Sequence, residues 1–181
     1  MNASRTRLGG LVAVGMLAVS GAAQAGFDGN TISADYLYSD IGTVYQALGS
    51  AVVGAGVEFS SFGISLDLSD TQITMSRPGE ITFLPGTFNG WRFYDATDNL
   101  PAITGVTVNG ATTISGFDNS RVSFDADHVW VNFVDLADAN DFYAVVDVAF
   151  AVPEPATWAM MLAGLGMVGA LAARRRPAGR T

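Results

Sequence analysis

Between residues 26 and 151 the apolar residues recur mostly at every second position, in short runs that Gly, Asn, Asp and Pro interrupt. A period of two is typical of strands that bury one face, and the interruptions are typical of turns. Because long helical segments do not separate the runs, we expect an all-β fold, an antiparallel β-sandwich or jelly roll. The range is long enough for one domain with its own core.

The last run of the domain, residues 142–150, is the clearest strand. Its expected buried face carries Phe142, Ala144, Val146, Val148 and Phe150. The other expected strands are residues 64–68, 73–75, 81–83, 103–108, 122–124 and 129–134. Residues 125–127 are expected to join a hairpin, and Asn109-Gly110 to form a turn. Val44, Leu48 and Val52 fall at four-residue spacing, which predicts a short helix within residues 41–53.

The predicted domain is strongly acidic. Residues 26–151 contain 16 carboxylates against three arginines and no lysine, a formal net charge of −13. Such a surface repels nucleic acid and anionic lipid, so nucleic-acid binding is excluded. We expect the scarce Arg77, Arg92 and Arg121 to pair with aspartates. The chain has no cysteine, which excludes disulfides, thiolate metal sites and thiol catalysis.

The N-terminus has the pattern of a secretory signal peptide. Arg5 and Arg7 provide a positive start, residues 8–19 are apolar, and Ala23-Gln24-Ala25 has the small-x-small form of a cleavage site. Signal peptidase is therefore expected to remove residues 1–25.

The C-terminus contains a second apolar segment. Residues 156–173 carry no charge, which reaches the length of about 18 residues at which a membrane span is predicted. Arg174, Arg175 and Arg176 follow directly, and such a cluster favours the cytoplasmic side. We expect one transmembrane helix over residues 156–173, with the arginines as its topological stop and the preceding domain outside.

This tail begins with Val152-Pro153-Glu154-Pro155, and its layout resembles the PEP-CTERM sorting tails of exported Gram-negative proteins. The resemblance is confined to the export signal and to residues 152–176 of the expected sorting tail, residues 152–181; residues 177–181 extend past the arginines, where such tails usually stop sooner. It implies that exosortase, a membrane-embedded cysteine transpeptidase, recognises Val152, Pro153, Glu154 and Pro155 and processes the chain there. It also implies transient anchoring in the inner membrane with the domain in the periplasm, followed by release to the cell surface or extracellular matrix, where such proteins accompany exopolysaccharide.

We therefore expect a non-enzymatic surface protein without catalytic residues, metal or cofactor. His128 is the only histidine, so a Ser-His-Asp triad has to use it; we expect an exposed or capping residue beside a turn.

Two alternatives remain open. The first is a calcium-assisted glycan-binding module. Its cation ligands come from the aspartates of residues 95–98, 125–127 and 135–141, and its sugar contacts from the aromatic side chains of residues 88–94 and Trp130. In residues 91–94 alternation places Trp91 and Phe93 on one face and Arg92 and Tyr94 on the other, so one aromatic pair is expected in the core. The second alternative is a surface glycoside hydrolase with paired carboxylates.

Overall fold

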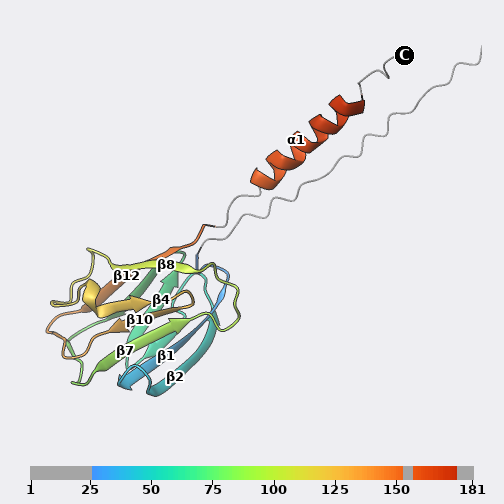
Figure 1. Cartoon of the computed structure of the whole chain (residues 1–181). Coiled ribbons are helices and arrows are strands. Elements are labelled where there is room, and N and C mark those ends of the chain that lie inside the picture. Colours follow the sequence, from blue (N-terminus) through green and yellow to red (C-terminus); the bar gives the residue numbers. More distant parts are fainter. Residues whose placement is uncertain (1–25, 153–156, 175–181) are drawn as a thin grey trace, which may run out of the picture.

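The computed structural model describes residues 26–152 and 157–174. The first range forms two five-stranded antiparallel sheets and a two-stranded pair. Figure 1 shows the large sheets as facing layers. The expectation of an all-β sandwich is confirmed for this range.

The first sheet has the strand order β2-β1-β7-β10-β9. Its strands are β1 (Thr31–Ser39), β2 (Val44–Val52), β7 (Phe88–Tyr94), β9 (Val122–Phe124) and β10 (His128–Asn132). Strand β7 lies in the centre, where Trp91 is opposite both Tyr36 of β1 and Val131 of β10.

The second sheet has the order β3-β4-β5-β12-β8. Its strands are β3 (Phe59–Ser61), β4 (Ile64–Ser69), β5 (Gln72–Arg77), β8 (Ile103–Val108) and β12 (Phe142–Phe150). Strands β6 (Ile81–Thr82) and β11 (Ala137–Asp138) form the separate pair, and a 3-10 turn, η1 (Asn119–Arg121), precedes β9.

The core lies between the two sheets and is rich in aromatic rings. Phe133 is at its centre: its ring stacks on those of Phe117 and Phe83, with centroids 4.5 and 4.9 Å away. Trp91 and Phe142 meet the same ring edge-on. All of these side chains are buried, which is the arrangement that aromatic pairs favour in cores.

The expected strands are found with small differences at their ends. Each of the seven predicted runs overlaps a strand, and the five side chains predicted for the inner face of β12 are all buried. Residues 125–127 join β9 to β10 as an antiparallel hairpin. Gly110 lies in a turn that the N–H of Thr112 closes on the carbonyl of Asn109.

The helix predicted within residues 41–53 is wrong. These residues form β2, an edge strand paired only with β1, with two register shifts. Asp40 stabilises the turn between β1 and β2, because its carboxylate accepts hydrogen bonds from the N–H of Gly42 and the hydroxyl of Thr43. Gly49 has a φ of 84°, which an α-helix does not accept. The four-residue spacing of Val44, Leu48 and Val52 therefore reflects an irregular edge strand.

Beyond the sandwich the described part of the tail is helix α1, Thr157–Arg174. Within the described residues, no helix combines the length and the apolar character needed to cross a membrane. The span predicted over residues 156–173 therefore stays a prediction. Residues 1–25, with the cleavage residues Ala23 and Ala25, lie outside the described residues.

Candidate functional site

The sandwich ends abruptly at the start of the tail. Phe150 closes β12 as a buried residue, and the N–H of Ala151 still donates to the carbonyl of Ala102 at 2.7 Å. The next side chain, Val152, is 74% exposed. The chain thus leaves the folded domain at the first residue of the predicted recognition motif. Pro153, Glu154, Pro155, Arg175 and Arg176 lie outside the described residues, and Arg174 is the last residue of α1.

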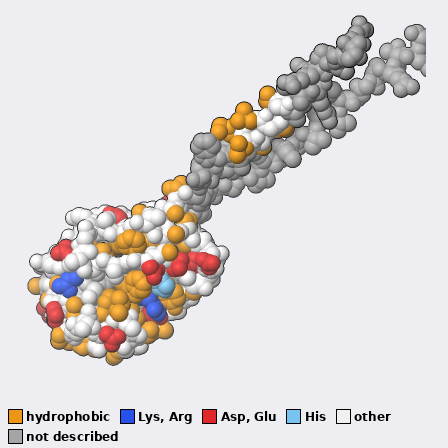
Figure 2. All heavy atoms as spheres, viewed as in Figure 1, with side chains coloured by type: hydrophobic (Ala, Val, Ile, Leu, Met, Phe, Trp, Pro, Cys, Tyr) orange, Lys and Arg blue, Asp and Glu red, His pale blue; other side chains and the backbone are white. Residues whose placement is uncertain are grey.

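The outer face of the first sheet carries a row of stacked side chains. The ring of His128 stacks between Trp130 and Tyr94, with centroid distances of 5.0 and 5.7 Å. The guanidinium of Arg92 lies over Tyr94 at 4.8 Å and pairs with the buried Asp35. Trp130 and Tyr94 are half-buried, so this row is a partly covered surface. Figure 2 shows the histidine side chain with basic, acidic and hydrophobic groups gathered around it.

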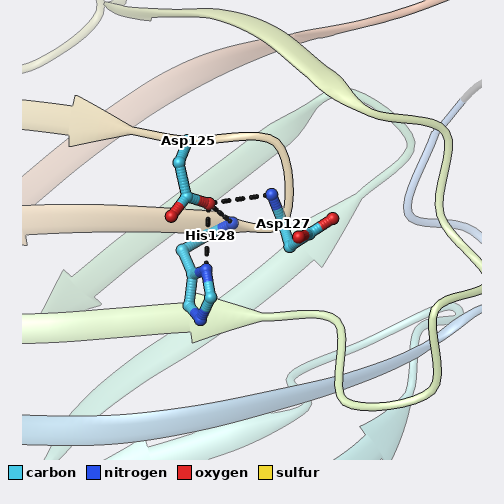
Figure 3. Close-up of polar contacts among 3 residues, drawn as sticks. All are labelled: Asp125, Asp127 and His128. Atoms are coloured by element: carbon cyan, nitrogen blue, oxygen red, sulfur yellow. Dashed lines mark hydrogen bonds and ion pairs between the residues drawn. The ribbon is translucent and has the colours of Figure 1, made fainter.

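His128 is held by the hairpin beside it. Asp125 Oδ1 accepts from the backbone N–H groups of Asp127 and His128 at 2.9 and 2.8 Å, and lies 2.9 Å from His128 Nδ1 (Figure 3). Burial acts to raise the pKa of Asp125, but these hydrogen bonds and the histidine outweigh it, so the pKa lies below its ordinary value. The structure thus confirms that His128 lies beside a turn, at the start of β10, but the residue is half-buried rather than exposed.

The other aspartate clusters serve their own turns in the same way. Asp95 accepts from the N–H groups of Thr97, Asn99 and Leu100, at distances of 2.6 to 2.8 Å. Asp138 accepts from Asn140. Within residues 26–152 and 157–174 no group of three or more acidic or histidine side chains is arranged to hold a metal ion.

The arginines only partly follow expectation. Arg92 pairs with Asp35 as predicted. Arg121 instead donates to the carbonyl of Val134 at 2.7 Å. The side chain of Arg77 has neither a hydrogen bond nor an ion pair with any residue that the structure describes.

The structure also contains a cleft that we did not predict from the sequence. It opens between the two sheets, at the end of β1. It has a volume of about 280 Å³ and a largely aromatic wall. Tyr45 and Phe62 are 64% and 55% exposed as residues, and their rings both pack on the ring of Tyr36, with centroid distances of 6.0 and 5.0 Å. The lining residues are Tyr36, Tyr38, Tyr45, Phe62, Ile64, Arg77, Ile81, Thr82, Phe83, Leu84, Asn89 and Trp91.

Polar groups fix the floor of this cleft. Burial, followed by the neighbouring Tyr38 and Tyr45, raises the pKa of Tyr36, which keeps its hydroxyl protonated. That hydroxyl donates to Asn89 Oδ1, and the Asn89 amide donates to the carbonyl of Leu84 at 2.9 Å. The buried indole N–H of Trp91 has no acceptor among the described residues. The alternating tyrosines 36 and 38 are the sequence signal that could have pointed here.

Together these features define a β-sandwich protein whose last strand leads directly into a C-terminal targeting tail. The family model of the PEP-CTERM protein-sorting motif matches residues 151–176. The chain therefore carries a PEP-CTERM sorting motif, and it is an exported protein that exosortase sorts. No curated protein and no solved structure matches the chain.

Proposed function

We propose that this protein is a non-enzymatic component of the cell surface or extracellular matrix that associates with exopolysaccharide. The observation that carries the proposal is the position of the sorting motif, directly after the last strand of a complete sandwich. Signal peptidase cuts after Ala25, the tail holds the domain in the periplasm for a time, and exosortase cuts at residues 153–155. The domain is then delivered to the surface.

The chemistry of the described residues supports a role without catalysis. The only histidine is hydrogen-bonded to Asp125 in its own hairpin. The carboxylates of Asp95 and Asp125 accept backbone N–H groups of their own turns, which leaves them poorly placed as general acids or bases. The cleft lining contains no Asp or Glu, so it offers no carboxylate pair for glycoside hydrolysis.

The sorting step is tested by the intact mass and the C-terminal peptide of the protein from a surface fraction of its own host. We expect a chain that starts at Gly26 and ends within residues 153–155. Glu154→Ala is expected to leave the tail in place, whereas Glu80→Ala, an exposed control outside the tail, is expected to be processed normally. An intact arginine-rich tail on the wild-type surface protein would contradict the proposal.

A second candidate is a glycan-binding module, which the outer-face row of Tyr94, His128 and Trp130 favours. Tyr94 and Trp130 are only half-buried, so part of their ring surface is available to a sugar ring. The calcium-assisted form is tested by melting the full chain with and without calcium and host polysaccharide. A ligand at 100 times its dissociation constant stabilises the fold by about 2.7 kcal/mol. An unchanged melting temperature with both additions would exclude it.

A further inference from the structure

The cleft between the two sheets combines exposed aromatic rings with a small volume. Tyr45 and Phe62 present most of their ring surface to solvent, although their centroids lie only 6.1 Å apart. Clustered aromatic rings are usually buried because each removes a large apolar area from water. A volume of about 280 Å³ is below the range of about 300–1,000 Å³ of typical small-molecule pockets. The cleft therefore has room for about one ring-sized group.

Charge is distributed unevenly around this cleft. Residues 26–151 contain 16 carboxylates, yet none of them lines it. Arg77 is the one charged lining residue. The strongly acidic domain thus has a small cleft whose lining contains no acidic side chain and one cation.

Arg77 is half-buried and has no partner in the described part of the chain, unlike Arg92 and Arg121. The guanidinium group of an arginine has five N–H donors and binds a carboxylate through two parallel hydrogen bonds. In a domain with so many aspartates, an arginine without one is available for a carboxylate from outside. The indole N–H of Trp91, also without an acceptor, belongs to the same cleft.

The backbone also holds one ring in an unusual conformation. Phe62 has a φ of 53°, in the left-handed region that bulky residues rarely adopt. Phe62 remains 55% exposed, so the burial of its ring offsets little of the free energy needed to hold this backbone conformation. Phe62 and Gly63 form the two-residue turn between β3 and β4, and both have positive φ, as this type of hairpin turn requires. The turn therefore holds the Phe62 ring at the cleft.

We infer that the cleft binds an acidic saccharide, with a sugar ring against Tyr45 and Phe62 and its carboxylate on Arg77. A uronic acid joins an apolar ring face to a carboxylate in one compact unit, which fits the small volume better than an extended acidic peptide does. The inference deepens the proposed association with exopolysaccharide and rests on it only for the source of the ligand. It does not depend on sorting.

The cleft and the tail lie at opposite ends of β12. Arg77 is opposite Phe142, the first residue of that strand, whereas Phe150, its last, leads into the tail. The inferred site is therefore separated from the processing segment by the length of a nine-residue strand. Sorting and binding can be tested independently.

The test is calorimetric titration of the full chain with tetragalacturonate and with its fully methyl-esterified form, which keeps the rings but loses the charge. The titration is done at 0.15 M salt, where a Debye length of about 8 Å screens the distant carboxylates of the acidic domain. Under these conditions we expect the acid to bind roughly tenfold to a hundredfold more tightly than the ester, the range for a hydrogen bond to a charged group. Arg77→Gln should bring the two affinities together, whereas Arg77→Lys should retain part of the difference. Tyr45→Ala should weaken both ligands, and Tyr143→Ala, an exposed tyrosine outside the cleft, should weaken neither.

Three results would overturn the inference: no binding of the acid by the wild type, equal affinity in the wild type and Arg77→Gln, or binding of a Glu-Glu-Phe-Glu peptide in place of the saccharide. Thermal melts of each variant establish that loss of binding is not loss of fold. Failure of this titration leaves the mass measurement of the tail unaffected, so the two proposals fail separately.

Discussion

The ring of Phe27 meets the ring of Phe150 edge-on, with 4.9 Å between their centroids. Phe27 precedes the first strand of the sandwich and Phe150 ends the last one. This contact therefore joins the segment where the chain enters the sandwich to the segment where it leaves (Figure 1). The N–H of Phe27 also donates to the carbonyl of Asp70 at 2.8 Å. The first described residues and the last residues of β12 therefore lie at the same side of the domain.

Phe27→Ala tests how strongly this contact holds the ends. Phe27 is 1% exposed, so its truncation removes buried apolar area and leaves a cavity. We expect the free energy of unfolding to fall by about 3–5 kcal/mol, measured by urea denaturation. The matched control is Phe124→Ala, whose ring is 43% exposed and whose loss is expected to cost about 1 kcal/mol or less. Equal losses in the two variants would show that the ends are not packed as described.

The ion pair of Asp35 and Arg92 is buried on one side, because Asp35 is 5% exposed. Removing only the cation strands that carboxylate, so Arg92→Gln is expected to cost about 3–5 kcal/mol. The double variant Asp35→Asn with Arg92→Gln should lose less than Arg92→Gln alone, since no charge remains buried. A double-mutant cycle from denaturation midpoints measures this coupling, and additive losses would contradict it.

Asp95 and Asp67 are expected to respond to pH with opposite signs. Burial acts to raise the pKa of Asp95, but hydrogen bonds from Leu100, Thr97 and Asn99 lower it overall. Its contribution to stability is present above the ordinary pKa of about 3.9 and is lost as the pH falls through the folded-state pKa. Asp95→Asn should therefore destabilise the fold at pH 7 and matter little near pH 2.

Burial, and then the charge of Glu58, raise the pKa of Asp67. Its ionised form is disfavoured in the fold, so the stabilisation by protonation is complete below the ordinary pKa and is lost as the pH rises through the folded-state value. Asp67→Asn is expected to stabilise the fold at pH 7 and to leave it unchanged near pH 3. Urea unfolding at pH 7, and at pH 2 for Asp95→Asn or pH 3 for Asp67→Asn, measures the two effects. Changes of the same sign at pH 7 would refute the expectation.

Phe62 allows a test of backbone strain. Glycine accepts a φ of 53° without the penalty of about 1–2 kcal/mol that other residues incur there. Phe62→Gly and Phe62→Ala remove the same ring, but only glycine also removes the penalty. We expect Phe62→Gly to be the more stable of the two by about 1 kcal/mol in thermal denaturation. The reverse order, which holds at ordinary strand positions, would exclude strain at this residue.

The sequence predicted the fold where local pattern and tertiary contact agree. Strand β12 alternates cleanly, and its inner face is buried as expected. Strand β2 was assigned wrongly because an edge strand has one neighbour and mostly exposed side chains, so burial does not impose a period of two on it. Its bulges, which the pairing with β1 determines, disturb the period further.

The two sites differ in how far they can be read from sequence. The sorting tail was recognised because its information is linear, in Val152, Pro153, Glu154, Pro155 and the arginines that follow. The cleft was missed because it brings together Tyr36, Tyr45, Phe62 and Arg77 from distant parts of the chain. The isolation of Arg77 depends on where the aspartates point, and no spacing in the sequence reveals that.

The course of β12 gives the molecule a polarity. The strand starts beside Arg77 and ends at the tail, and nine residues of strand cover roughly 30 Å. A copy attached to a support through its processed C-terminus would hold its cleft on the far side, facing outward. A dense layer of such copies would present an outer surface of aromatic clefts, each containing one arginine, while the rest of each domain stays strongly acidic.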